Sequence, residues 1–123
     1  MSEQHLVFVY GTLRKGYKNH HLMAGARDLG PARSLESYAL FLDDYPYLVK
    51  TQAVAPVVGE LYAVDEAGLA RLDQLEEHPN WYCRERITVL DQAGRRREAW
   101  VYFFPRPQGR LLASGDLREA GDY

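Results

Sequence analysis

One stretch of this chain has the residue spacing of an amphipathic helix, and this limits the folds that the chain can adopt. Asp65 is placed as an N-cap, and Glu66 follows in the first turn, where the helix dipole favours an acidic side chain. Leucines then recur at helical spacing as far as Leu75. Because Pro79 cannot continue a helix, the pattern predicts one helix over about residues 65–77. A chain with one such helix must take most of its core from strands.

Short β-rich runs separated by turn residues account for most of the remaining chain. The predicted strands are residues 5–10, 37–42, 57–64, 84–90 and 98–104. The sequence Asp91-Gln92-Ala93-Gly94 predicts a hairpin turn between the last two strands, and Asp43-Asp44-Tyr45-Pro46 predicts a second turn. The stretch around residues 20–26 has room for a short second helix, and the chain beyond Pro105 has the composition of a loop.

These elements predict an α+β fold, with a small, mixed, barrel-like β-sheet of about five to seven strands and one clear helix. Most connections are short and suit antiparallel strands, so a doubly wound parallel sheet is not expected. With 123 residues the chain has the size of a single domain, and residues 1–123 are expected to form one.

Composition excludes several classes of protein. Apolar residues make up 46% of the chain and charged residues 26%, and the net charge of −2 is too small for a disordered chain. No apolar run approaches the roughly 18 residues that a membrane helix needs. The opening MSEQHLVFVYGT has no basic region before its apolar segment, so a secretory signal is not expected. The pI near 6.1 argues against a nucleic-acid partner.

The chain has a single cysteine, Cys83. One cysteine cannot form an internal disulfide or a cysteine-based zinc cluster, and it fits a reducing compartment, so a cytoplasmic localisation is expected. Because Cys83 lies in a predicted strand, its expected role is packing. A nucleophilic cysteine would need a neighbouring histidine, and His20 or His78 could supply one.

Glu76 has an unusual place for an acidic residue. It follows Leu72 by four residues, which puts it on the apolar face of the helix, and it lies in the last turn, where the dipole disfavours an anion. Burial and the dipole would both raise its carboxyl pKa toward the range useful for general acid–base catalysis. Alternatively, Glu76 points out of a frayed helix end or pairs with Arg84 or Arg86. Its neighbour Glu77 faces away and is expected to be an ordinary solvated acid.

The loop after the first strand, Tyr10-Gly11-Thr12-Leu13-Arg14-Lys15-Gly16, is the second candidate. Gly11 lets the backbone turn and lets a ligand approach closely, so successive N–H groups could point at an anion or a developing oxyanion. The glycine spacing excludes a P-loop and a dinucleotide fingerprint. A plain turn at the exit of the strand is the alternative.

Other clusters point to no chemistry. His20, His21 and His78 do not fall at ligand spacing with a third partner, so no metal and no other cofactor is expected. The arginines at 95–97 are interpreted as a solvated entry to a strand. The sequence Ser114-Gly115-Asp116 lacks the context of a nucleophile elbow and is interpreted as a polar loop.

Tyrosine is abundant, with nine residues. Tyrosine pairs an apolar body with a polar tip, so it suits both a half-buried sheet and the wall of a polar cavity. Five of the nine stand in predicted strands or near their ends: Tyr10, Tyr38, Tyr62, Tyr82 and Tyr102.

Four blocks of sequence, taken in order, resemble the gamma-glutamylcyclotransferase-like superfamily, and most closely its gamma-glutamylaminecyclotransferase and AIG2-like branch. The blocks are VYGTLRKGYKNH at 9–20, GELYAVDE at 59–66, LDQLEEHP at 72–79 and YCR at 82–84. Beyond Ile87 the likeness is mainly one of strand pattern.

The resemblance implies a barrel-like sheet with a helix packed beside it, and an enzyme that uses no cofactor. Such an enzyme cleaves a gamma-glutamyl amine by attack of the substrate's own α-amine on its γ-carbonyl, and it releases 5-oxoproline and a free amine. The essential glutamate of the family maps onto Glu76, as general acid and base. The substrate loop of the family maps onto Tyr10, Gly11, Thr12 and Leu13.

Further residues are expected to bind the substrate, with Tyr62, Tyr82 and Tyr102 as pocket walls and Arg84 as a carboxylate partner. The expected partner is a small molecule with a gamma-glutamyl group, rather than a nucleic acid or a membrane. The protein is expected to be a monomer or a weak homodimer.

Two other functions are considered. One is a non-catalytic module that binds a small glutamyl or carboxylate ligand in the same pocket. The other is nucleic-acid binding through Arg14, Lys15, Lys18 and the arginines at 95–97, against which the near-neutral charge argues.

Overall fold

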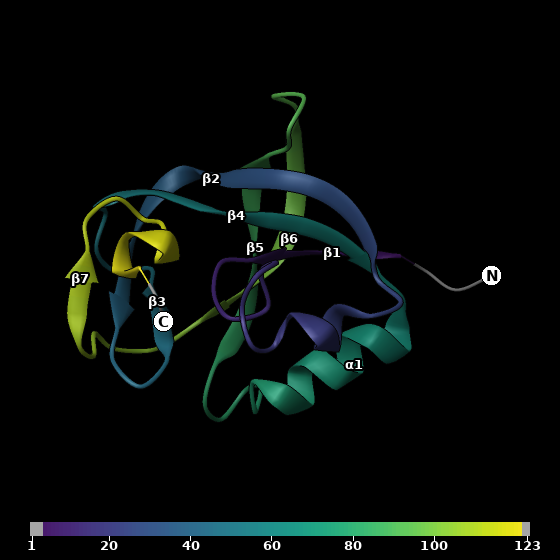
Figure 1. The fold of residues 1–123 in the computed structure, drawn as a ribbon, viewed down its shortest axis with the longest axis horizontal. Helices are drawn as coiled ribbons and strands as arrows, with labels where there is room; N and C mark the ends of the chain where they lie inside the picture. The colour runs from purple at the N-terminus through teal and green to yellow at the C-terminus, as the bar shows by residue number, and fades with distance from the viewer. Residues whose placement is uncertain (1–3, 122–123) are drawn as a thin grey trace.

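Five strands of the protein close into a barrel, drawn as a ribbon in Figure 1. The computed structural model describes residues 4–121. The barrel strands are β1 (His5–Val9), β2 (Arg27–Leu42), β4 (Ala55–Val64), β5 (Cys83–Leu90) and β6 (Arg96–Phe103). They follow one another in the order β2, β4, β1, β6 and β5, and the pairing of β2 with β5 closes the barrel. All pairs are antiparallel except β1 with β6, which is parallel.

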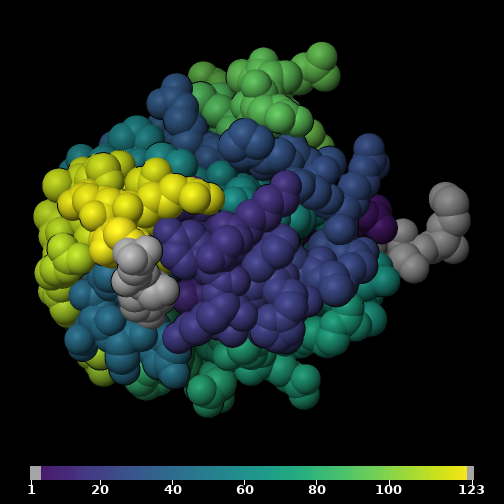
Figure 2. Space-filling model, in the orientation of Figure 1, coloured from purple at the N-terminus to yellow at the C-terminus, as the bar shows by residue number. Residues whose placement is uncertain are grey.

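The remaining elements flank this barrel. Two extra strands, β3 (Pro46–Val49) and β7 (Arg110–Leu112), pair with the C-terminal part of β2. The single α-helix among residues 4–121, α1 (Glu66–Leu75), lies beside the barrel, and two 3-10 helices span His20–Met23 and Leu117–Ala120. On the surface, the segment between β1 and β2 lies between the C-terminal segment and α1 (Figure 2). The predicted α+β fold with a mixed barrel-like sheet is confirmed.

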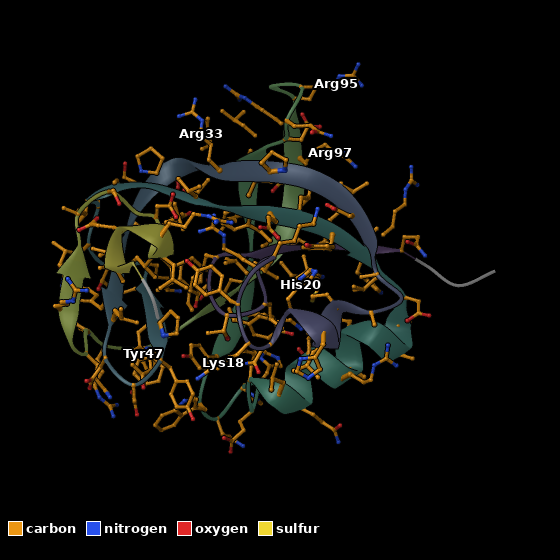
Figure 3. The ribbon with its side chains drawn as sticks, viewed as in Figure 1. Lys18, His20, Arg33, Tyr47, Arg95 and Arg97 are labelled. Atoms are coloured by element: carbon orange, nitrogen blue, oxygen red, sulfur yellow. The ribbon has the colours of Figure 1, made fainter. Side chains whose placement is uncertain are left out.

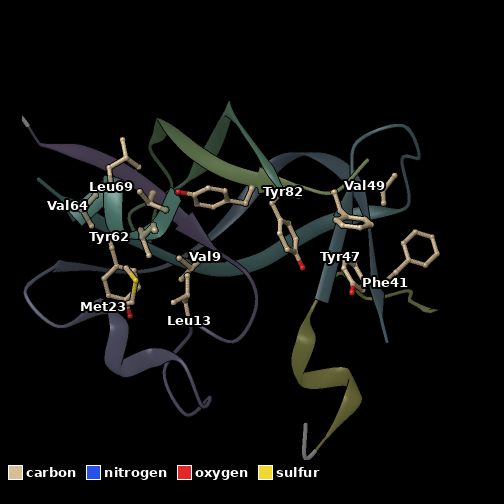
Figure 4. Packing of buried hydrophobic residues seen from close by; sticks show 14 of the residues in the cluster. Val9, Leu13, Met23, Phe41, Tyr47, Val49, Tyr62, Val64, Leu69 and Tyr82 are labelled. Atoms are coloured by element: carbon tan, nitrogen blue, oxygen red, sulfur yellow. The ribbon is translucent and has the colours of Figure 1, made fainter. Parts of the chain in front are cut away.

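The core is divided between the inside of the barrel and the space between the barrel and α1. Side chains alternate along β1, so Phe8 lies inside the barrel, whereas Val7 and Val9 face α1 and pack in one cluster with Leu69 and Leu72. Figure 4 shows the cluster on the α1 side. Because both faces of β1 are covered, its residues from Leu6 to Val9 form an uninterrupted apolar run.

The start of α1 is as predicted. The side chain of Asp65 accepts a hydrogen bond of 2.7 Å from the amide of Gly68, which makes Asp65 the N-cap. Within residues 4–121 no helix is long and apolar enough to span a membrane.

The end of α1 is a Schellman motif, and it comes two residues earlier than predicted, at Leu75. The amide of His78 donates to the carbonyl oxygen of Asp73 at 2.9 Å, and the amide of Glu77 donates to that of Gln74 at 3.2 Å. Glu77 adopts the left-handed conformation that this motif requires, with φ of 52°. Glycine usually fills that position. Because Glu77 stands there instead, the sequence does not show where the helix ends.

The strand β2 is much longer than the predicted strand 37–42. Its first half is interrupted, since Gly30 has φ of 91° and the register with β4 shifts between Asp28 and Pro31. Such irregularities remove the period-two pattern by which a strand is recognised. This half is a strand because β4 and β5 pair with it.

Three further differences concern short segments. The chain beyond Pro105 is not all loop, because it contains β7 and the second 3-10 helix. The predicted turn at residues 43–46 leads directly into β3, and the predicted helix at 20–26 is a single 3-10 turn. Elements of three or four residues are too short to show a period. The hairpin turn at 91–94 is confirmed by a 2.9 Å hydrogen bond from the amide of Gly94 to the carbonyl oxygen of Asp91.

Gly59 on β4 is required by a close approach of β1. A Cβ atom at this position would lie 2.2 Å from the carbonyl oxygen of Val9 and 2.9 Å from the ring of Phe8. We expect Gly59→Ala to lower the free energy of unfolding by about 3 kcal/mol, because the added methyl group overpacks the barrel wall. Urea unfolding followed by circular dichroism measures this change.

The matched control is Gly94→Ala in the exposed hairpin turn. Its added methyl group meets open space, and only the positive φ of 77° opposes the change, at a cost of about 1 kcal/mol. Equal losses for the two variants would show that the barrel wall accommodates the methyl group at position 59.

Candidate active site

A pocket of about 670 Å³ opens between the loop after β1, the end of α1 and tyrosines of the barrel. Buried lining residues form its interior and exposed ones form its mouth. Seven of the nine predicted site residues line it: Tyr10, Gly11, Thr12, Leu13, Glu76, Tyr82 and Tyr102.

Glu76 presents a carboxyl group to this pocket from the C-cap position of α1. Its backbone is held on both sides, because its amide donates to the carbonyl oxygen of Leu72 at 2.9 Å and its own carbonyl oxygen accepts from the amide of Tyr82 at 3.1 Å. Burial raises the pKa of Glu76 to about 7. The carboxyl can therefore gain and lose a proton near neutral pH. Glu77 is exposed, as predicted, although it also lines the pocket.

Three residues of the loop after β1 that line the pocket, Gly11, Thr12 and Leu13, have backbone amides without an acceptor in the described part of the chain. Their carbonyl oxygens are occupied: that of Gly11 accepts from the amide of Arg14 at 3.1 Å, that of Thr12 from the amide of Asn19 at 3.0 Å, and that of Leu13 lies 2.9 Å from a ring nitrogen of His20. Among residues 4–121 no group accepts a hydrogen bond from the amides of Gly11, Thr12 and Leu13. These three N–H groups can therefore bind an anion or an oxyanion of a ligand.

Buried charges fix this loop to the barrel and to the C-terminal segment. Arg14 is only 4% exposed, and its Nη1 lies 2.7 Å from Oδ1 of Asp116. Its Nε lies 3.8 Å from Oε2 of Glu60, too far for a hydrogen bond but close enough for charge attraction. Glu60 also accepts a 3.0 Å hydrogen bond from the amide of Lys15. The loop is therefore held by Glu60, a buried carboxylate on a barrel strand that needs these charged and hydrogen-bonding partners.

Tyr62 belongs to this anchoring group and does not line the pocket, contrary to the prediction. Its hydroxyl donates to Oε1 of Glu60 at 2.8 Å, and its ring is 2% exposed. Glu60 and Tyr62 lie on the same face of β4, as alternation predicts, but that face meets the loop rather than the pocket.

Arg84 also lies outside the pocket lining, and its carboxylate partner is Asp73. The guanidinium donates from Nε to Oδ1 at 2.8 Å and from Nη2 to Oδ2 at 3.2 Å. The same Oδ1 accepts a 2.7 Å hydrogen bond from the hydroxyl of Tyr102, which does line the pocket. Arg84 therefore does not pair with Glu76, and it acts on the pocket only through Asp73 and Tyr102.

Three tyrosines that line the pocket, Tyr10, Tyr82 and Tyr102, each donate a hydroxyl hydrogen bond within the protein. The hydroxyl of Tyr10 donates to the carbonyl oxygen of Tyr102 at 2.7 Å, and that of Tyr82 donates to the carbonyl oxygen of Pro46 at 2.8 Å. Burial, followed by nearby negative charges that include Glu76, raises the pKa of Tyr10 and of Tyr102. These phenols stay neutral, and the oxygen of Tyr102 remains able to accept a hydrogen bond.

Sequence reasoning missed Asp73 and the anchor formed by Arg14 and Glu60. Asp73 precedes Glu76 by three residues on the helix, and this spacing places both on one side of α1, so a signal existed. Arg14 and Glu60 lie far apart in the sequence, and neither stands in a pattern that indicates burial.

The other candidates take part in no common site. Among residues 4–121 no three His, Cys, Asp or Glu side chains lie together in the arrangement of a metal site. Cys83 is exposed, so the predicted packing role is wrong: it lies on the outer side of β5. Ser114 donates its hydroxyl to Glu119 at 2.5 Å, and Asp116 pairs with Arg14, as in a polar loop.

Together the fold and the pocket define a small β-barrel protein with one titrating carboxyl in a pocket for a small ligand. The family model described as gamma-glutamyl cyclotransferase, AIG2-like, matches residues 7–122. The Methanocaldococcus jannaschii protein MJ1514 is 40% identical over 92% of this chain and 95% of its own length. Gamma-glutamylaminecyclotransferase C of Danio rerio is 35% identical over 80% of this chain and 74% of its own.

Comparison with solved structures points to the same family. The crystal structure of an AIG2-like protein from Mus musculus has a TM-score of 0.74 and 30% identity, covering 82% of this chain and 77% of that one. The chain belongs to the gamma-glutamyl cyclotransferase, AIG2-like family.

The raised pKa of Glu76 predicts a pH dependence of stability. The folded protein holds this proton up to about pH 7, whereas the unfolded chain loses it near 4.5, so the stabilising contribution is complete below pH 4.5 and is lost as the pH rises through 7. Between pH 4 and pH 8 the wild type is expected to lose about 3 kcal/mol of unfolding free energy relative to Glu76→Gln. Urea unfolding at a series of pH values measures the difference.

Glu77→Gln is the control for removal of a carboxyl group at this end of α1. A difference between wild type and Glu76→Gln that stayed constant with pH would mean that the Glu76 carboxyl is solvated.

Proposed function

We propose that this protein is a cofactor-independent gamma-glutamyl cyclotransferase, which releases 5-oxoproline and a free amine from a gamma-glutamyl amine. The observation that carries the proposal is the sharing of one pocket by the Glu76 carboxyl, with pKa about 7, and the unpaired amides of Gly11, Thr12 and Leu13. Membership of the family supports the same reaction.

The reaction needs one group that first removes a proton and then returns it. The α-ammonium of the substrate is not a nucleophile, so the Glu76 carboxylate takes a proton from it. The freed nitrogen attacks the γ-carbonyl carbon, and a tetrahedral oxyanion forms. Protonated Glu76 then gives its proton to the amide nitrogen, and the C–N bond breaks. The ring nitrogen still carries a second proton from the α-ammonium, which the Glu76 carboxylate takes and passes to the freed amine, so that the amine leaves as an ammonium ion. A pKa near 7 suits both steps at neutral pH, because neither protonation state is scarce.

The loop amides suit the negative charge that the reaction develops. Donors without a protein acceptor, at Gly11 to Leu13, can hold the oxyanion with no need for the loop to rearrange. A well-placed donor of this kind contributes about 3 kcal/mol to lowering the barrier. The anchor of Arg14 on Glu60 and Asp116 keeps these amides in place.

Tyr102 is placed to orient the attacking α-amine of the substrate. It lines the pocket, its hydroxyl proton is committed to Asp73, and its oxygen keeps a lone pair with which it can act as an acceptor. In this role Tyr102 accepts a hydrogen bond from the α-amine and turns the nitrogen lone pair toward the carbonyl carbon, which favours ring closure.

The arrangement of the basic side chains favours a small molecule, rather than a nucleic acid, as the partner. Arg14 is buried in ion pairs, so it is not available to a phosphate backbone, and Lys15 pairs with Asp28 at the surface. Arg95 and Arg97 lie at the β5–β6 hairpin, at the opposite end of the molecule from Lys18 (Figure 3). The basic residues therefore form no continuous stripe of the kind that binds nucleic acid. A monomer or weak homodimer in the cytoplasm remains our expectation.

Loss of the Glu76 carboxyl tests the proposal. We expect Glu76→Gln to lower the kcat for 5-oxoproline release by about 1,000-fold, because the amide can neither take nor give the proton. For the wild type, kcat/KM is expected to rise with pH and to level off above about pH 7, where Glu76 is a carboxylate. Chromatographic detection of 5-oxoproline from a panel of gamma-glutamyl amides measures both.

Glu77→Gln makes the same chemical change at the next residue and is expected to alter kcat less than about 3-fold. Wild-type turnover by Glu76→Gln would refute the assignment. Saturable binding of gamma-glutamyl amides by the wild type, with no product from any of them, would instead indicate the non-catalytic binding module.

The role of Tyr102 is tested by Tyr102→Phe, which removes the acceptor oxygen and keeps the ring. We expect kcat to fall about 30-fold with a smaller change in KM, since the oxygen orients the amine for attack. Tyr82→Phe is the matched control, because it removes a hydroxyl in the same pocket that donates to a carbonyl oxygen. Equal losses of kcat in the two variants would assign the effect to general packing of the pocket.

A further inference from the structure

The mouth of the pocket has an apolar character that the reaction at the glutamyl group does not explain. Seven large apolar side chains of residues 4–121 are exposed, and three of them, Tyr45, Leu75 and Trp81, line this pocket. They come from the turn after β2, the end of α1 and the loop before β5. We call these three side chains the collar. Exposed apolar residues scattered singly need no explanation, but a group gathered at a pocket indicates a ligand.

Trp81 is held firmly although it is open to solvent. Its ring lies edge-on to that of Phe104, with centroids 5.2 Å apart, and Phe104 is buried against Tyr47 and Tyr82. The amide of Trp81 donates to the carbonyl oxygen of Glu77 at 2.8 Å. The side chain is nevertheless 40% exposed. An ordered aromatic ring with an open face is preorganised to pack against a ligand.

The collar lies where the amine half of a gamma-glutamyl amide must lie. Leu75 directly precedes Glu76, whose carboxyl must reach the leaving nitrogen. With the glutamyl half in the buried interior, near the loop amides, the amine half extends through the mouth. The volume of about 670 Å³ falls in the range of pockets for drug-sized ligands, and a glutamyl group is much smaller than such a ligand.

The three collar side chains carry no charge. Lys18 lies with its Nζ 5.7 Å from the centre of the Tyr45 ring, and Glu77 is the exposed acid in the lining. An amine half with its own charge would lose hydration against Leu75 and Trp81 without gaining a charged contact from them. An uncharged aryl or alkyl group loses little hydration and buries apolar area instead.

From these observations we propose that the collar recognises the amine half of the substrate, and that this half is an uncharged apolar group, such as an arylalkyl group. The inference rests on the proposed function. In the reaction the α-nitrogen bonds to the γ-carbon, and the C–N bond to the apolar amine breaks. The two protons that the α-nitrogen loses pass in turn through Glu76 to the leaving nitrogen, and no further reactant is needed.

The test compares kcat/KM for gamma-glutamyl amides that share the glutamyl half. The amine halves are methylamine, butylamine and benzylamine, together with glycine and the ε-amine of lysine, which carry charge. We expect kcat/KM for the benzylamide to exceed that for the methylamide by about 30-fold, and to exceed those for both charged amides. Trp81→Ala is expected to reduce the ratio of benzylamide to methylamide about 10-fold, and Trp81→Phe is expected to retain most of it.

Leu111→Ala is the matched control, because Leu111 is also 40% exposed but lies outside the pocket lining. This variant is expected to keep the wild-type ratio. Equal kcat/KM for benzylamide and methylamide, or a higher value for the charged amides, would overturn the inference and leave the proposed function standing.

A second measurement separates the two proposals if no amide yields 5-oxoproline. In that case the proposed function fails, and calorimetry with Glu76→Gln decides the inference on the collar without any need for turnover. Tighter binding of the benzylamide than of the methylamide, weakened by adding Trp81→Ala, would support it. Equal binding of the two amides would overturn it.

Discussion

The geometry of the pocket depends first on a buried carboxylate, Glu60, which is 7% exposed. A carboxylate removed from water is costly unless it is paired and hydrogen-bonded, and its partners here are the amide of Lys15, the hydroxyl of Tyr62 and the charge of Arg14. Two of these three belong to the loop that lines the pocket. Arg14 extends the arrangement to Asp116 in the C-terminal segment. The loop is therefore held in place because Arg14 and the amide of Lys15 pair with a carboxylate on a barrel strand.

The opposite wall of the pocket depends on the last turn of α1. The carbonyl oxygen of Asp73 helps to end the helix, and its side chain holds the hydroxyl of Tyr102. Glu76, three residues further, takes the C-cap position, where its carboxyl is shielded from water. A single turn thus sets the direction of the chain, the orientation of a phenol from β6 and the acidity of a carboxyl. Arg84 stabilises the turn from β5.

Local patterns were sufficient to predict the helix, most of the strands and the anomalous position of Glu76, because each depends on residues close in sequence. Partnerships between distant residues could not be predicted. Tyr62 was expected to line the pocket, but alternation along a strand does not reveal which face meets the ligand, and Glu60 takes its hydroxyl. Arg84 was expected to bind a carboxylate of the substrate, but it lies outside the pocket lining and pairs with Asp73. The first half of β2 was missed because its pairing with two other strands, rather than its composition, makes it a strand.

The parallel pairing of β1 with β6 affects how the protein folds while it is synthesised on the ribosome. Val7 lies opposite Trp100, and the hydroxyl of Tyr10 reaches the backbone of Tyr102, 92 residues later. Contacts between residues so distant in sequence form late and slowly. Until β6 emerges, β1 has an unpaired edge that can join strands of other chains. The barrel, and with it the pocket, can be completed only after β6 has been synthesised, so a nascent chain that ends before β6 has no complete form of this site.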